Sequence, residues 1–188
     1  MARIFAAALV LTLVVSGAAS AETSAQLGLP GVRVPGDSHV NGFRFSFLYG
    51  ENERMEGLDF GLLSLSETGN LSGVRLVMGV GMLNGDMEAG AAFALVNVHK
   101  GTDSGLNAAF INKTHNPENA VDFGFVNIAD ETSLVDIGGL NMANRSTVQL
   151  GFINFANRID GFQFGFINVA KNGFLPVFPI FNFGIPED

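Results

Sequence analysis

Three aspartates offer the clearest opportunity for chemistry, because they recur at the same point of a repeated segment. Asp59, Asp122 and Asp136 are each followed by one apolar residue and a glycine. Arg44 and Arg75 take the same place in two other copies. Two carboxylates held close together could act as the general acid and base of a hydrolase. The arginines favour structural ion pairs instead, and we therefore predict no catalytic residue and no enzymatic activity.

The other reactive residue types are sparse and badly placed for a site. The histidines, His39, His99 and His115, have no His or Cys two or four residues away, as a metal site would need. The sequence contains no cysteine, no nucleophile elbow and no phosphate-binding loop. His115 could meet Glu118 in a loop but is interpreted as an exposed turn residue. We predict no metal site and no cofactor.

The aspartates belong to a repeat of about 14 residues that covers most of the chain. The segment Gly-Phe-Ile-Asn at 151–154 returns at 165–168, and related segments precede these two copies. Successive copies end 13 to 20 residues apart. The residues that end the copies, mostly asparagines, are Tyr49, Ser64, Asn84, Asn97, Asn112, Asn127, Asn141, Asn154, Asn168 and Asn182.

Side chains alternate with a period of two inside each copy, which is the period of a β-strand. In one copy Phe123, Phe125 and Asn127 would share a face, and the residues between them would share the other. Turn-forming stretches rich in Gly, Asn, Asp and Ser separate the copies. We expect an all-β protein of about ten strands, each of roughly eight or nine residues and followed by a turn.

Two arrangements of these strands account for the repeat. An antiparallel meander, closed into a barrel of about ten strands to remove its edges, agrees with the variable length of the turns. A β-solenoid would stack equivalent residues into ladders of asparagine and glycine, but each unit would then have to return to its start within a short turn. We expect the barrel and keep the β-solenoid as the alternative.

The direction of the phenylalanine side chains decides the function of such a barrel. If they point outward, membrane lipid covers them and the protein is a small outer-membrane barrel. If they point inward, the protein is a soluble periplasmic barrel that binds an apolar ligand. We expect a non-enzymatic structural protein of the cell envelope, with the ligand binder as the alternative. The side chains concerned include Phe123, Phe125, Phe152, Phe164 and Phe166.

The two ends of the chain differ from the repeat. Residues 1–21 have the order of a secretory signal peptide, with Arg3, an apolar stretch at 4–15 and Ala-Ser-Ala before Glu22. Residues 22–40 are expected to form an N-terminal arm.

The remaining residues, 41–188, are expected to form a single β-repeat domain. Near its end, Pro176 and Pro179 lack N–H donors, and we expect them on a sheet edge. The net charge of −8 argues against nucleic acid as a partner. The sequence leaves the oligomeric state open.

The repeat unit and the C-terminal ending together resemble a known family. The unit G-[FLV]-x-[FIL]-G-[FL]-[IV]-N, seen as GFQFGFIN at 161–168, and the ending NGFLPVFPIFNF at 172–183 are similar to those of exported surface repeat proteins of Gram-negative bacteria and spirochaetes. The resemblance covers roughly residues 40–184. It implies a location in the outer membrane, in the periplasm or at the cell surface, and it implies no activity and no functional residue.

The signal-peptide pattern predicts where the exported protein begins. We expect the mature chain to start at Glu22, because small side chains occupy the −3 and −1 positions before it. The intact mass of protein recovered from an envelope fraction checks this prediction. A mass that includes Met1 would contradict it.

Overall fold

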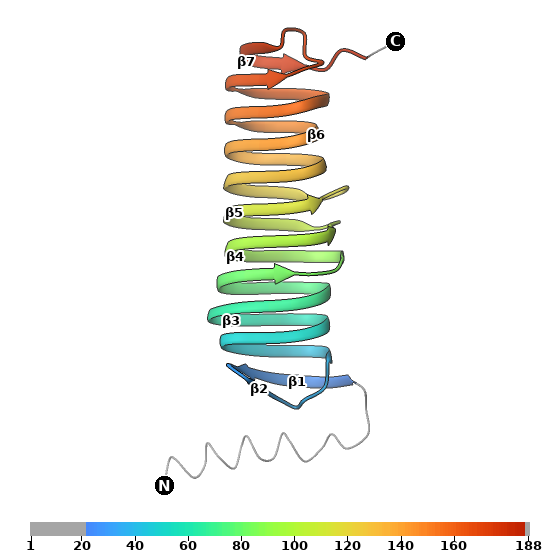
Figure 1. The fold of residues 1–188 in the computed structure, drawn as a ribbon, viewed down its shortest axis with the longest axis vertical. Helices are drawn as coiled ribbons and strands as arrows, with labels where there is room; N and C mark the ends of the chain where they lie inside the picture. Colours follow the sequence, from blue (N-terminus) through green and yellow to red (C-terminus); the bar gives the residue numbers. More distant parts are fainter. Residues whose placement is uncertain (1–21, 187–188) are drawn as a thin grey trace.

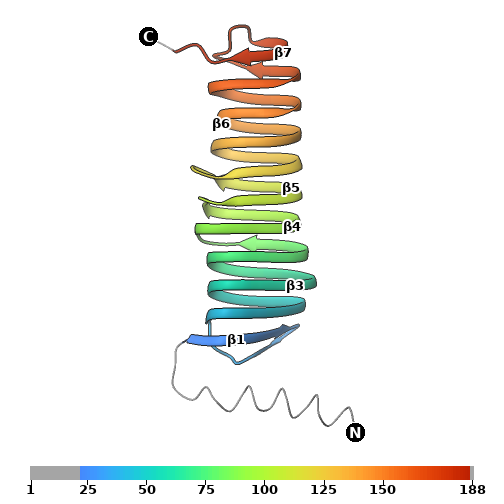
Figure 2. The ribbon, with the colours of Figure 1, turned by 180° about the vertical axis from the view of Figure 1, so that it is seen from behind.

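The computed structural model describes residues 22–186 and shows a β-solenoid, a rod in which the chain winds in successive coils (Figure 1). The view from behind shows the same stack of coils (Figure 2). The seven strands are β1 (Glu22–Leu29), β2 (Val32–Val34), β3 (His39–Leu83), β4 (Met87–Thr102), β5 (Leu106–Asn116), β6 (Val121–Ala170) and β7 (Val177–Phe183).

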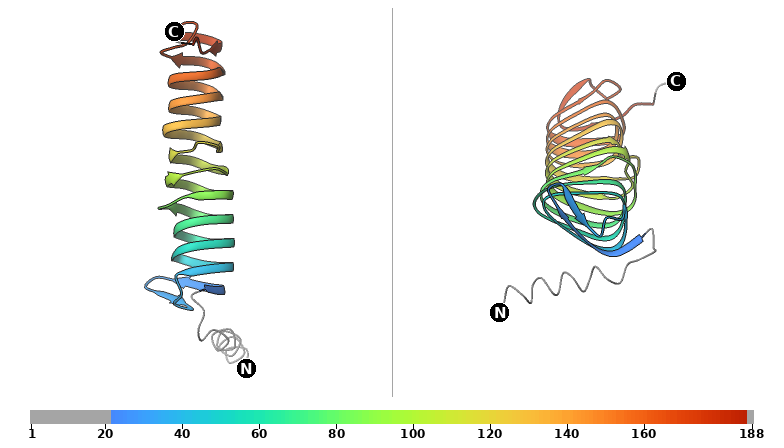
Figure 3. Two further views of the ribbon diagram at one scale, coloured as in Figure 1. Left: turned by 90° about the vertical axis from the view of Figure 1, so that its right-hand side faces the viewer. Right: turned by 60° about the horizontal axis from the view of Figure 1, so that its bottom comes forward.

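The expected barrel and antiparallel meander are wrong, because the coils pair in parallel. Strand β3 pairs in parallel with β4, β4 with β5 and β5 with β6. Strands β3 and β6 are 45 and 50 residues long, so each contains several repeats. Each of these strands continues through the corners of several coils, and no separate return segment is needed (Figure 3). The expected need to return to the start of each unit within a short turn was therefore wrong.

The expectation that phenylalanine and asparagine of a repeat share one face is also wrong, because each unit contains a corner. Asp122 and Gly124 face the interior, and Phe125 and Val126 then lie on the outside in succession. Asn127 is again inside and fully buried. Strict alternation holds only along a straight strand, so two consecutive outward residues reverse the assignment beyond the corner. Asparagine therefore shares the interior with aspartate and glycine, and phenylalanine lies outside.

Glycine and asparagine of the repeat occupy the interior together because glycine leaves room for the amide. A Cβ atom on Gly124 would lie 2.6 Å from Oδ1 of Asn127 and 2.9 Å from Nδ2 of Asn112. Such contacts are shorter than side chains tolerate. The Gly-Phe-Ile-Asn segment is therefore one packing unit, in which the glycine admits the asparagine side chain.

The interior changes in character along the rod. The N-terminal coils enclose an apolar cluster beside their polar residues, whereas the buried apolar side chains of the C-terminal coils are alanines and Ile159. The apolar cluster consists of Val40, Met55, Leu71, Leu83, Met87 and Ala92. The buried small side chains of the C-terminal coils include Ala129, Ala143, Ala156 and Ala170.

Short strands close the two ends of the stack. At one end, β1 pairs in parallel with the start of β3 and carries the antiparallel strand β2, so most of the expected N-terminal arm belongs to the sheet. At the other end, β7 runs antiparallel to β6 and is the last strand of the sheet. Pro179 lies in β7 where the pairing register shifts, as a residue without an N–H donor requires.

Residues 1–21, to which the signal peptide is assigned, lie outside the described part of the chain. Among residues 22–186, no helix is long and apolar enough to cross a membrane.

Replacing Gly165 by valine tests the close packing of the coils. A Cβ atom on Gly165 would lie 2.1 Å from the carbonyl oxygen of Gly151 and 2.6 Å from Nδ2 of Asn154. We expect Gly165→Val to lower the free energy of unfolding by about 3 kcal/mol or more, since added volume in a packed interior is destabilising. Denaturant unfolding measures the change. The control is Asn157→Ala, at an exposed hydrogen bond to Asn144, for which we expect a loss below about 1 kcal/mol. Equal losses would contradict the packing.

Candidate functional site

Three charged side chains stack in the interior of the N-terminal coils. Arg44 donates from Nε to Oδ1 of Asp59 at 2.9 Å and from Nη2 to Oδ2 at 2.7 Å, which is a bidentate pair. Arg75 donates from Nε to the same Oδ2 at 3.0 Å. All three side chains are fully buried. The shared repeat position thus places Asp59 between two arginines, as the structural interpretation of the sequence predicts.

The surroundings of Asp59 fix its charge. Burial alone would raise the pKa of this carboxyl group, but the ion pairs with Arg44 and Arg75 and a hydrogen bond from Ser66 hold the pKa below its usual range. Burial lowers the pKa of Arg75, and the charge of Asp59 opposes that effect. Removing one member of a buried ion pair costs about 3–5 kcal/mol. Asp59 is therefore a permanent structural anion.

A second polar cluster surrounds Asp103. Nδ1 of His99 lies 2.5 Å from Oδ2 of Asp103. Asn107 donates from Nδ2 to that oxygen at 2.6 Å and to Oδ1 of Asp122 at 2.7 Å. Thr114 donates to the other oxygen of Asp122 at 3.3 Å. Sequence reasoning missed this cluster, because it compared each histidine with other histidines and cysteines and overlooked the carboxylate four residues after His99.

The remaining two repeat aspartates are protonated more readily than Asp59. Burial raises the pKa of Asp122 to about 7, and the charges of Asp136 and Asp103 add to the rise. Burial also raises the pKa of Asp136, against hydrogen bonds from side chains that include Ser133. Asp59, Asp122 and Asp136 are at most 1% exposed. Because the solenoid wall separates these carboxyl groups from solvent, they cannot contact a substrate as a hydrolase requires.

An asparagine ladder runs through the interior of the C-terminal coils. Asn112 donates from Nδ2 to Oδ1 of Asn127 at 2.9 Å, and Asn127 donates in the same way to Asn141 at 2.8 Å. The second N–H of each amide binds a backbone carbonyl, such as that of Phe123 for Asn112. Each ladder member is fully buried. The members are Asn97, Asn112, Asn127, Asn141, Asn154 and Asn168.

The two outer histidines lie on the solvent side of the coils. The nearest acidic groups to His115 are Asp130 and Glu131, each with an oxygen at 3.5 Å, instead of Glu118. His39 lies 3.6 Å from Glu53. Exposed pairs of this kind contribute about 0–1 kcal/mol. Within the described range, no three His, Cys, Asp or Glu side chains gather as a metal-binding group.

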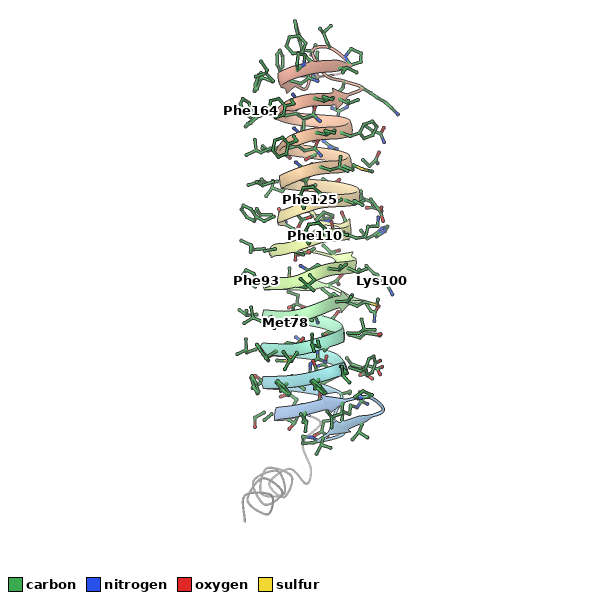
Figure 4. All side chains as sticks on the ribbon, turned by 90° about the vertical axis from the view of Figure 1, so that its left-hand side faces the viewer. Met78, Phe93, Lys100, Phe110, Phe125 and Phe164 are labelled. Atoms are coloured by element: carbon green, nitrogen blue, oxygen red, sulfur yellow. The ribbon has the colours of Figure 1, made fainter. Side chains whose placement is uncertain are left out.

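The outside of the rod carries an apolar face. Its side chains form two columns. In one of them Phe110 lies over Phe125 with ring centroids 5.1 Å apart and Phe152 lies over Phe166 at 5.6 Å, and Gly139 lies against Phe125 in the coil between these pairs. Figure 4 shows Phe93, Phe110, Phe125 and Phe164 along this side, with Lys100 on the other edge of the rod. We define the apolar face by Leu76, Met78, Phe93, Leu95, Phe110, Phe123, Phe125, Phe152, Phe164 and Phe166, which are all exposed.

The outward direction of these side chains removes the basis for a ligand inside a phenylalanine-lined barrel. Phe125 is 59% exposed and Phe166 is 70% exposed, whereas the interior holds amides and carboxyl groups. Two shallow hollows lie between the columns of the apolar face. One, of about 360 Å³, has Gly151 and Gly165 among its lining residues, and the other, of about 350 Å³, lies between Phe60 and Leu95. The surface thus has ridges and hollows of apolar atoms.

No family model, curated protein or solved structure matches the chain. The likeness to exported surface repeat proteins rests on the repeat unit and the ending at 172–183. The geometry of the interior and of the apolar face is therefore the basis for a function.

Replacing Asp122 by asparagine tests the pKa of this carboxyl group. Folded Asp122 keeps its proton up to about pH 7, whereas the unfolded chain releases it near pH ~4. Stability therefore falls as the pH rises from about 4 to about 7, by up to about 4 kcal/mol at 1.4 kcal/mol per unit. We expect Asp122→Asn to lose most of this decline, measured as the free energy of unfolding against pH.

The control for this measurement is Asp86→Asn, at an exposed carboxylate that accepts a hydrogen bond from the backbone of Thr102. This variant should keep the pH profile of the unchanged protein. An Asp122→Asn profile that coincides with it would contradict the assignment.

Proposed function

We propose that this protein is an exported structural component of the cell envelope, a rod that acts by packing through its apolar face and performs no catalysis. The apolar face carries this proposal. Its ten side chains, from Leu76 to Phe166, are all apolar and exposed. Large contiguous apolar patches on an otherwise polar surface mark sites of interaction. The face is therefore an assembly surface.

The interior supports a structural role. Many of the buried polar groups bind one another: Asp59 binds two arginines, Asp103 binds His99, and each asparagine of the ladder binds its neighbours. These contacts hold successive coils in register. The polar contacts of the interior thus stabilise the rod, and the outer surface is available for binding a partner.

Export is supported by the signal-peptide pattern of residues 1–21 and by the resemblance to surface repeat proteins. The absence of cysteine from the sequence also suits an oxidising compartment, where free thiols would be oxidised. The interior ladders stabilise the rod without disulfides. The periplasm, the outer membrane and the cell surface are the locations that agree with this chemistry.

Single cysteines introduced into the cysteine-free chain test both the location and the covered face. Phe166→Cys lies on the apolar face, and Lys171→Cys is a matched exposed position three residues beyond the asparagine ladder. In a Gram-negative host producing the full-length chain, we expect a thiol reagent added to the envelope fraction to label Lys171→Cys and to spare Phe166→Cys until denaturant is added.

Two outcomes would contradict the proposed function. The first is recovery of the full-length chain, with Met1, in the cytoplasmic fraction. The second is equal labelling of the two cysteines in the native envelope fraction, because the apolar face would then be uncovered. Denatured samples, in which both positions must react, serve as the control for labelling.

A further inference from the structure

We infer that the apolar face binds the apolar face of a second copy of this chain, which gives a two-fold dimer of rods. The inference rests on the proposed function, in which this face is an assembly surface, and it names the occupant. Three features of the face support a second copy: its area, its axial repeat and its lack of charge.

The area is sufficient for a stable dimer. Phe110, Phe125, Phe152, Phe164 and Phe166 are between 55% and 70% exposed. Since an aromatic side chain offers about 150–250 Å², each exposes roughly 100 Å², and eight such side chains reach the roughly 800 Å² per partner of a standard interface. With Met78 and Leu95, which are 55% and 62% exposed, and three members that are 36–40% exposed, the ten side chains of the face together reach that requirement.

The axial repeat of the face matches a second copy. Its columns advance by one coil at a time, and coils of a sheet are about 4.8 Å apart. A second solenoid of the same chain has the same spacing between coils. The phenylalanine side chains of one copy can therefore lie in the hollows of the other. The hollows near Gly165 and near Leu95 show that such space exists toward both ends of the face. Facing sheets pack in this way about 10 Å apart.

The charge distribution favours contact between two copies at this face. The chain has a net charge of −8, which makes contact between charged sides unfavourable. The apolar face itself is uncharged. A lipid surface is the competing occupant, but surface-binding faces are flanked by Lys, Arg and Trp that contact headgroups. The sequence has no Trp, and its 18 acidic residues outnumber the 10 basic ones, so anionic headgroups would repel it.

Sedimentation velocity on the purified chain from Glu22 onward tests the inference. We expect a dimer for the unchanged protein. The double variant Phe110→Ser and Phe125→Ser removes a stacked pair from the middle of the face, and both positions already face outward. We expect it to weaken the dimer at least tenfold, which equals about 1.4 kcal/mol, while the circular dichroism spectrum stays unchanged.

The matched control is the double variant Lys100→Ser and Glu131→Ser on the exposed charged side, which keeps the net charge and should keep the dimer. A monomeric unchanged protein would overturn the inference, and so would a dimer that both double variants retain. If the unchanged protein forms fibres and the double phenylalanine variant does not, the face forms an open assembly, and the dimer is contradicted. A monomer that sediments with vesicles of phosphatidylethanolamine and phosphatidylglycerol would identify lipid as the occupant.

This test separates the two proposals. Protection of Phe166→Cys in the envelope with a monomeric purified protein would leave the proposed function standing and remove the second copy. A dimer in solution with the full-length chain in the cytoplasm would contradict the proposed function and support the second copy.

Discussion

The fold depends on a single constraint: a buried amide must find hydrogen-bond partners in the coils on either side of it. Asn127 is fully buried, and its amide group is satisfied by Asn112, by Asn141 and by backbone carbonyls. A buried polar group without partners costs about 1–3 kcal/mol. A slip of one residue would break these bonds along the whole ladder at once. The ladder therefore selects parallel coils in register, and it requires a small residue such as Gly124 beside each amide.

Placing amides inside moves the large apolar side chains to the outside. An interior just wide enough for stacked asparagines has no room for a phenylalanine ring, and the rings stack on the surface instead, as Phe110 and Phe125 do. Stacking of this kind contributes roughly 0.5–1.5 kcal/mol per pair beyond burial. It leaves one side of each ring facing outward. The same constraint that organises the rod thus creates a surface whose apolar area is fully removed from water only by a partner.

The sequence predicted an all-β repeat and the shared position of Asp59 with Arg44 and Arg75, because these follow from local spacing. The predicted barrel of about ten short strands was wrong, because pairing between coils is not visible in the sequence. The predicted sidedness was also wrong, because period-two alternation was carried across the corner between Phe125 and Val126. That step placed asparagine on the phenylalanine side. Strand pairing is also non-local: Gly81 pairs with Asn97, so the exposed Asn84 was the wrong marker of its coil. The contact of His99 with Asp103 likewise depends on how the chain turns between the two residues.

The coils shorten along the rod, and the groups that they enclose change. Arg44 and Arg75 are the largest fully buried side chains; Arg44 and Asp59 are 15 positions apart, and Asp59 and Arg75 are 16 positions apart. The separation is 15 between Asn112 and Asn127 and 14 between Gln149 and Gln163. An ion needs several donors or acceptors around it, whereas an amide binds its copies above and below. Amides that bind from coil to coil therefore continue to the C-terminal end, where Phe152 and Phe166 stack on the outside and form the surface that a second rod can meet.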